Sequence, residues 1–292
     1  MRKYSGFYLD IYLKRYLNRD ITMIFCLVNG VQQSHIDIEN RGLAYGDGLF
    51  TTAKIENGHI QYLSAHIERL LLGCKKLAIN PPLQAELAQQ LNSVAKHYSL
   101  AVLKVIITAS SGGRGYARSA SNHYDLIIMV HEYPSHYDEL ASTGIKLGLS
   151  QQQLGLNPML SGLKHLNRLE QVLLRKELST RTEDDLLVTN VNGNVIESTS
   201  ANLFFYFNDK WHTPDVSQSG VNGIMRQAIL HHYPKTLIKS FTVEDVAQAQ
   251  TMFICNCVMG IMPVIVFNNK ALSIDRVQDV RTAINKDVNN HG

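Results

Sequence analysis

The chain has 292 residues, of which 45% are apolar and 18% are charged. This balance excludes a mostly disordered chain, and the length favours two domains over one. The 28 basic and 25 acidic residues leave a net charge of only +3, and no segment is apolar for the roughly 20 residues of a membrane helix. We therefore expect neither a nucleic-acid nor a membrane partner. Four cysteines without a disulfide-like framework favour reduced thiols in a cytoplasmic protein.

Residues 1–22 mix basic and aromatic side chains but contain neither the apolar stretch nor the cleavage site of a signal peptide. We interpret them as an N-terminal extension of uncertain order, with a short amphipathic helix as the alternative. A smaller α/β domain is predicted for residues 23–137, and a larger one for residues 138–292. The polar stretch 133–143, which contains Pro134, is the predicted linker.

The smaller domain is predicted to begin with a β-meander. Asn29-Gly30 and Asn57-Gly58 each separate two apolar runs and are typical of tight hairpin turns. Further elements follow in chain order: a helix from Ser64, a helix over Gln84–His97, a strand over Ala101–Ala109, a Gly-rich loop over Ser110–Tyr116 and a strand over Tyr124–Glu132. The pattern indicates a sheet with helices beside it.

The larger domain is predicted to repeat this mixture of strands and helices. Its predicted strands are Ile145–Leu149, Asp185–Asn190, Val195–Glu197, Ala201–Phe207, Thr251–Cys255 and Ile261–Phe267. Its predicted helices are Leu163–Glu177, with apolar residues along one side, Asn222–His232 and Ile274–Asn285. The fold class is therefore α+β.

Lys164 is the first candidate for chemistry, because it ends an apolar segment next to a predicted helix. A lysine facing a cleft between domains would be desolvated, which lowers its pKa and frees the amine to form a Schiff base. A surface lysine at a helix start is the alternative, and the local sequence alone favours it.

Three other segments contain residues that suit an anionic cofactor. Glu197 directly precedes a hydroxyl-rich turn, and Gly220–Arg226 is a glycine turn that runs into a helix. Amides at such a helix start can bind a phosphate, and Arg69, on a predicted helix, offers a forked contact to one. Taken singly, each is equally consistent with a helix cap, a turn or a surface arginine. The CxC of Cys255 and Cys257 lacks a second cluster of ligands, so we expect no metal site.

Taken together, seven stretches resemble the fold-type IV enzymes that use pyridoxal 5'-phosphate, the class of branched-chain and D-amino-acid aminotransferases. They are Arg41–Thr52, Leu63–Leu70, Ser111–Tyr116, Gly162–Val172, Glu197–Phe204, Gly220–Gln227 and Ile254–Val264. Within this class, SGGRGY, KHLNRLEQ and GVNGIMRQ resemble the aminodeoxychorismate lyases of folate synthesis. The resemblance implies a two-domain α+β fold with the cofactor in the cleft between the domains.

The resemblance also implies roles for individual residues. Lys164 would hold the cofactor covalently and then act as the mobile acid-base, and Glu197 would pair with the pyridine nitrogen. Arg69 and the backbone amides of Ile224 and Met225 would hold the phosphate, and Asn256 would add a further phosphate contact. Leu169 stands where the aminotransferases often place a tyrosine that contacts the ring hydroxyl.

The implied reaction converts 4-amino-4-deoxychorismate into 4-aminobenzoate and pyruvate. Lys164 would remove the hydrogen from the amine-bearing ring carbon, and Lys164, Thr52 or a bound water would protonate the leaving group. Two alternatives stay open: an aminotransferase of the same fold, and a non-catalytic ligand-binding module. The resemblance also implies a homodimer, in which loops of one subunit lie near the site of the other.

The substrate carries two carboxylates, and Arg114 in the Gly-rich loop is the best candidate to bind one of them. A guanidinium matches a carboxylate, and the three neighbouring glycines let the backbone approach closely. A mobile loop with a solvated arginine is the alternative. Tyr45, Phe50 and Tyr116 are candidates for the wall around the substrate ring, although simple packing would also explain them.

Overall fold

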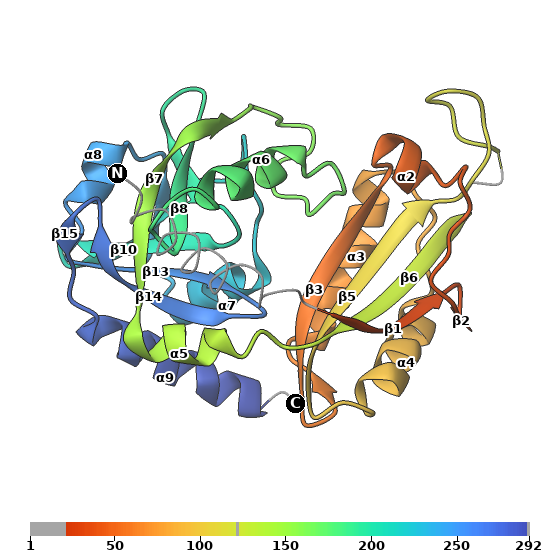
Figure 1. The fold of residues 1–292 in the computed structure, drawn as a ribbon, viewed down its shortest axis with the longest axis horizontal. Helices are drawn as coiled ribbons and strands as arrows, with labels where there is room; N and C mark the ends of the chain where they lie inside the picture. The colour runs from red at the N-terminus through yellow and green to blue at the C-terminus, as the bar shows by residue number, and fades with distance from the viewer. Residues whose placement is uncertain (1–21, 121–122, 291–292) are drawn as a thin grey trace, which may run out of the picture.

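The computed structural model describes residues 22–120 and 123–290. The predicted N-terminal extension therefore lies outside the described residues, apart from Thr22. Two β-sheets organise this part of the chain, a smaller one at the right of Figure 1 and a larger one at the left. Among the described helices, none is both long and apolar enough to cross a membrane.

The smaller sheet contains six strands in the order β2-β1-β6-β5-β3-β4, and every neighbouring pair is antiparallel. Its elements are β1 (Met23–Val28), β2 (Val31–Gln32), α2 (Arg41–Tyr45), β3 (Gly48–Glu56), β4 (His59–Ile60), α3 (Leu63–Lys76), α4 (Gln84–Ala95), β5 (Leu100–Ala109) and β6 (Tyr124–His131). Both predicted hairpin turns are confirmed, because Asn29, Gly30, Asn57 and Gly58 all have positive φ.

Strand β3 gives the smaller sheet two different faces. Leu49, Ala53 and Ile55 alternate along one face and pack with helices α3 and α4 in a fully buried core. The residues between them, including Phe50 and Thr52, point to the opposite face and are only partly buried. This alternation follows from the two-residue period of a strand, and it leaves one face of β3 free to contribute to a site.

The larger sheet contains nine strands, in the order β12-β11-β10-β13-β14-β7-β8-β9 with β15 paired to β14. Its elements are α5 (His136–Thr143), β7 (Ile145–Leu154), α6 (Leu169–Leu178), β8 (Asp185–Asn190), β9 (Val195–Ser198), β10 (Asn202–Phe207), β11 (Lys210–Pro214), α7 (Ile224–His232), β12 (Leu237–Lys239), α8 (Val243–Ala247), β13 (Thr251–Asn256), β14 (Gly260–Phe267), β15 (Lys270–Ala271) and α9 (Asp275–Asn290). The pairs β7–β8, β7–β14 and β11–β12 are parallel.

Both faces of the larger sheet are covered. Phe204 and Phe253 stack on each other and pack with helices α7 and α9. Phe205 points the other way and meets the edge of Phe241 in a second core cluster. Mixed parallel and antiparallel strands with helices beside both sheets confirm the predicted α+β class.

Helix α5 was not predicted, and one predicted helix begins later than expected. The predicted linker contains helix α5, whose acidic first turn at Asp138 and Glu139 complements the helix dipole. The helix predicted from Leu163 begins only at Leu169, because residues 163–166 take their backbone hydrogen bonds elsewhere. The predicted apolar side of this helix, with Leu169, Val172 and Leu173, is exposed, and α6 buries Leu174 and Leu178 instead.

Residues 163–166 connect the two sheets. The backbone N–H of Phe50 donates to Lys164 O at 2.9 Å, and the N–H of Leu166 donates to Gly48 O at 3.0 Å. These bonds place an extended segment of the larger domain along the start of β3. The candidate lysine therefore lies where the two halves of the molecule meet.

Candidate active site

The amine of Lys164 occupies a desolvated position between the two sheets. Its Nζ lies 4.7 Å from the centre of the Phe50 ring. Burial, with smaller contributions from the positive charges of Arg168 and Arg69, lowers the pKa of Lys164 to about 8 against the opposing effects of Glu197 and Cys257. An amine with this pKa is neutral in about a fifth of molecules at physiological pH, and the neutral form is the one that acts as a nucleophile or base.

The carboxyl group of Glu197 lies within electrostatic reach of this amine. Glu197 is on strand β9 and only 6% exposed. Burial raises its pKa, while the hydrogen bond that its Oε2 accepts from the Val221 N–H at 3.0 Å opposes that rise. The next residues form a turn that Asp185 holds, because this buried carboxylate accepts bonds from the hydroxyls of Ser198 and Thr199.

The start of helix α7 faces the same region. Its N-cap, Gly223, offers no side chain to the first-turn amides, which belong to Ile224 and Met225. Nη2 of Arg69 donates to Asn222 O at 2.7 Å, so the guanidinium lies beside this helix start. Burial lowers the pKa of Arg69, and no ion-pair partner of Arg69 is found in the described part of the chain.

The thiol of Cys257 lies in the same place, although we did not predict it there. The backbone N–H of Met225 donates to its sulfur, and Arg69 and Lys164 act on it electrostatically. Neighbouring Asn256 uses its side-chain oxygen to accept from the N–H groups of Val258 and Met259, and its amide nitrogen donates to Ser200 O. These hydrogen bonds of Asn256 stabilise the turn after β13. Its contact with a phosphate stays a prediction.

Strand β3 brings Thr52 to the side of the sheet that carries Phe50. Thr52 is paired in register with Lys104 of β5. Nζ of Lys104 lies 5.4 Å from the centre of the Phe50 ring, so two lysines contact this ring. Burial lowers the pKa of Lys104. The sequence analysis missed Lys104, because a single lysine in an apolar strand carries no distinctive motif.

His66 contributes a neutral imidazole to the neighbouring part of helix α3. Its Nδ1 lies 2.6 Å from Thr51 Oγ1, and its Nε2 is buried without a hydrogen-bond partner. Burial lowers the pKa of His66 to about 3, and the charges of Arg69 and Lys164 add to that effect. A neutral ring is therefore maintained beside two cationic groups.

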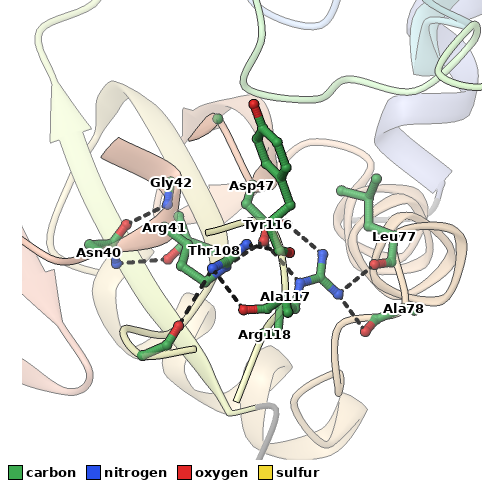
Figure 2. A network of polar contacts seen from close by, with 12 residues as sticks. Asn40, Arg41, Gly42, Asp47, Leu77, Ala78, Thr108, Tyr116, Ala117 and Arg118 are labelled. Atoms are coloured by element: carbon green, nitrogen blue, oxygen red, sulfur yellow. Dashed lines mark hydrogen bonds and ion pairs between the residues drawn. The ribbon is translucent and has the colours of Figure 1, made fainter. Parts of the chain in front are cut away.

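A cluster of ion pairs anchors the Gly-rich loop, as Figure 2 shows. Asp47 accepts from Nε of Arg41 and from Nε of Arg118, each at 2.9 Å, and its second oxygen pairs with Nη2 of Arg118. The rest of the Arg41 guanidinium donates to loop carbonyls, including those of Gly115 and Tyr116 at 3.0 Å. The carbonyls of Leu77 and Ala78 accept from Nη1 of Arg118. We did not predict this cluster.

The predicted substrate contacts on this loop are solvent-exposed. Arg114 is exposed, and its backbone pairs with Ala117 in both directions. Tyr116 is 89% exposed and its ring lies 5.6 Å from that of Tyr45, at the rim of a cavity of about 570 Å³ that His165 also lines. In Figure 1 the segment between β5 and β6 extends away from both sheets. Arg114 is therefore open to solvent, whereas the amine of Lys164 is desolvated.

Another cavity, of about 830 Å³, is lined by residues 165–172, which directly follow Lys164. Arg168, Gly220 and Ser219 contribute to its wall, and Leu169 lies at its edge with 71% of its surface exposed. Leu169 thus offers no buried contact in place of the aminotransferase tyrosine. Among the described residues, no group of three or more histidine, cysteine or acidic side chains is placed to hold a metal ion.

Comparison with known proteins agrees with this geometry. Residues 48–266 match the amino-transferase class IV family. The chain belongs to that family. Over 242 residues it is 35% identical to the aminodeoxychorismate lyase of Vibrio harveyi, a match that covers 81% of this chain and 89% of that one. The match confirms the resemblance that the sequence motifs indicated.

Solved structures of class IV proteins have the same architecture. The crystal structure of 4-amino-4-deoxychorismate lyase from Pseudomonas aeruginosa superposes with a TM-score of 0.85 at 32% identity, covering 90% of this chain and 98% of the other. A branched-chain amino acid aminotransferase from Escherichia coli superposes with a TM-score of 0.81 at 18% identity, covering 91% and 94%. The second likeness establishes the shared fold alone.

Proposed function

We propose that this class IV protein is a lyase that uses pyridoxal 5'-phosphate to convert 4-amino-4-deoxychorismate into 4-aminobenzoate and pyruvate. The observation that carries the proposal is the desolvated amine of Lys164, with its lowered pKa, opposite the buried carboxyl group of Glu197. The 35% identity to a lyase supports elimination over transamination, because the matching aminotransferases are less similar, at 24% identity or below.

The residues around Lys164 fit the cofactor. Arg69 is a desolvated cation without an ion-pair partner in the described region, beside a helix start whose N-cap, Gly223, offers no side chain. A phosphate would neutralise this guanidinium and accept from the amide of Ile224, and from that of Met225 in place of the Cys257 sulfur. Glu197 is placed to share a proton with a ring nitrogen. When bound, pyridoxal phosphate supplies an electron sink for the carbon next to the substrate amine.

Each side chain then has a defined task. Nζ of Lys164 takes the proton from the amine-bearing ring carbon of the substrate. Oγ1 of Thr52, on the same face of β3 as Phe50, passes a proton to the departing enolpyruvyl oxygen and regains one from the protonated Lys164 amine. The Phe50 ring limits the movement of the lysine amine and excludes water from one side of it. A base held this close to the reacting carbon needs little reorganisation, which supplies much of the rate.

Lys104 is the better placed of two cations for a substrate carboxylate in the same subunit. It lies beside Thr52 and on the Phe50 ring, and the burial that lowers its pKa is not offset by a carboxylate. A substrate carboxylate would supply that missing negative charge. Arg114 remains the proposed partner of the other carboxylate, and its exposure in its own subunit is consistent with contact across a dimer.

We infer that the protein is a homodimer. Leu169 and Val172 on α6 are 71% and 59% exposed, and Leu43 and Met159 add 58% and 79% exposed side chains. Leu43, Leu169 and Val172 line the same cavity, so they form one apolar surface beside the site. An exposed surface of this kind favours burial against a second copy. Sedimentation should give a dimer for the native chain and a monomer for V172E, while K75E, an exposed change elsewhere, stays dimeric.

The lyase assay tests the main proposal. Native protein loaded with pyridoxal phosphate should release 4-aminobenzoate from 4-amino-4-deoxychorismate, followed by its fluorescence. Conversion of the cofactor to its amine form by a simple amino acid, with no 4-aminobenzoate, would indicate an aminotransferase. Protein that never acquires the absorbance of a lysine-bound cofactor would indicate a binding module without this chemistry.

A further inference from the structure

The backbone around Lys164 is held at three consecutive carbonyl groups. Nη2 of Arg168 donates to Leu163 O at 2.6 Å, and Nε of the same guanidinium donates to His165 O at 3.0 Å. The carbonyl of Lys164 between them accepts from the Phe50 N–H at 2.9 Å. One arginine therefore brackets the lysine from the larger domain, while β3 holds it from the smaller one.

The Arg168 guanidinium also acts on both charged groups of the site. Burial lowers the pKa of Arg168, and Glu197 opposes that change. Arg168 in turn lowers the pKa of Lys164 and opposes the burial-driven rise in the pKa of Glu197. A desolvated cation is costly, and here its cost is offset by backbone carbonyls and by the Glu197 carboxylate.

We propose that Arg168 is the positioning residue of this site, which fixes the backbone on both sides of Lys164 and sets a positive charge beside the lysine amine. This inference rests on the proposed role of Lys164. It assigns two separable effects to one side chain. The two N–H groups that donate to Leu163 O and His165 O hold the backbone geometry, and this effect requires a guanidinium. The positive charge disfavours a second cation nearby, and this effect requires only a positive group.

Three other groups also act on the Lys164 amine: Arg69 on α3, Glu197 on β9 and Cys257 after β13. His66 on α3 lies in the same region, and Lys104 on β5 contacts the Phe50 ring that Lys164 also contacts. Arg168 has the largest effect among the charged neighbours of Lys164. Removing Arg168 should therefore shift the pKa of the Lys164 amine more than removing any other single charge.

Competitive labelling separates the two effects in the full-length protein. Trace acetic anhydride modifies only neutral amines, so the labelling of the Lys164 peptide against pH gives the amine pKa without cofactor or turnover. R168Q should raise that pKa by about 0.5–1 unit, since a nearby positive charge is lost. R168K should keep it within about 0.3 unit, because the charge remains. R175Q, an exposed arginine on α6, should change nothing.

The turnover rate then tests the two hydrogen bonds that the Arg168 guanidinium donates. Both R168Q and R168K should lose at least about tenfold in kcat, because a lysine cannot span the carbonyls of Leu163 and His165. Equal labelling profiles for R168Q and native protein, or native kcat in R168K, would overturn the proposal. If R168Q fails to fold, the labelling profile and the kcat of R168K still test the proposal. Absence of lyase activity in native protein would refute the proposed function alone, because labelling does not depend on it.

Discussion

Two regions of this molecule gather basic side chains, and they treat the charges in opposite ways. At the Gly-rich loop, Arg41 and Arg118 share the Asp47 carboxylate, and other N–H groups of both side chains donate to backbone carbonyls. Beside Phe50, Lys164 and Lys104 contact an aromatic ring, and burial lowers the pKa of each amine.

This difference distinguishes charges that stabilise the fold, at the Gly-rich loop, from charges that are available for chemistry, beside Phe50. A desolvated cation with a full set of partners stabilises the fold only in that arrangement, and it has no donor left for a ligand. A desolvated cation without an anion raises the free energy of the unliganded protein, and an anionic ligand lowers it again. The incomplete pairing around Lys164 therefore supports the proposed positions of the phosphate and carboxylates.

The strongest test of the comparison removes the lysine amine. K164A should lose at least about 10³-fold in turnover, because both the covalent attachment and the base are lost. Its thermal unfolding should match that of the native protein before cofactor is added. K75A, which changes an exposed lysine on α3, should retain full activity. Substantial 4-aminobenzoate formation by K164A would remove the basis for the proposed site.

Asp47 tests the fully paired region. Burial alone would raise its pKa, but hydrogen bonds from Arg118 and Arg41 outweigh burial and lower it. D47N should reduce the free energy of unfolding by about 2–4 kcal/mol, because two partly buried cations lose their shared anion. E183Q, which breaks a more exposed pair with Arg181, should cost less than about 1 kcal/mol.

The pH dependence of this contribution has a definite sign. Asp47 has a lower pKa in the folded state than in the unfolded chain, so its stabilisation is complete above the unfolded value of about 4 and disappears as the pH falls through the folded value. The difference in unfolding free energy between native protein and D47N should therefore shrink in acid. A difference that grew in acid would contradict the pairing of Asp47.

Cofactor loading tests the unpaired region through pH. Only the neutral amine attacks an aldehyde, and the pKa of Lys164 is lowered to about 8. The rate constant for loading should rise about tenfold per pH unit below 8 and level off above about 9. The absorbance of the lysine-bound cofactor, followed by stopped flow, measures this rate. A rise continuing to pH 10 or beyond would mean that the amine is not desolvated in solution.

Lys104 and Arg114 provide the smallest and most selective test. K104M should raise KM for 4-amino-4-deoxychorismate about tenfold with little change in cofactor affinity, because one charged contact to a carboxylate is lost. R114A should raise KM in the dimer by a similar factor or less. A parallel loss of cofactor affinity in K104M would move this lysine from the substrate side to the phosphate side of the site.

Local signals in the sequence predicted the elements whose causes are themselves local. Asn29-Gly30 and Asn57-Gly58 adopt the positive φ values that such turns require, and the strand Asp185–Asn190 has the predicted bounds. The motifs also indicated the family to which the chain belongs. The roles that the resemblance implies for Lys164, Glu197 and the start of α7 stay predictions.

The features that could not be predicted from the sequence depend on contacts between segments that are distant in the chain. Leu163–Arg168 has a helical spacing of apolar residues, yet its backbone bonds to β3 and to the Arg168 guanidinium instead. Lys104 gains its importance only from strand pairing with Thr52. No local pattern reveals that Asp47 will meet Arg118 on another segment.

The order of the strands has a consequence for the growing polypeptide on the ribosome. Cys257 follows β13, β13 pairs with β14, and β14 returns to lie against β7 near the beginning of the larger sheet. A nascent chain that has already made Lys164 therefore still lacks Cys257, which acts electrostatically on the lysine amine, and the strand that joins β13 to β7. We expect a chain that stops before β14 to bind pyridoxal phosphate less tightly than the finished protein.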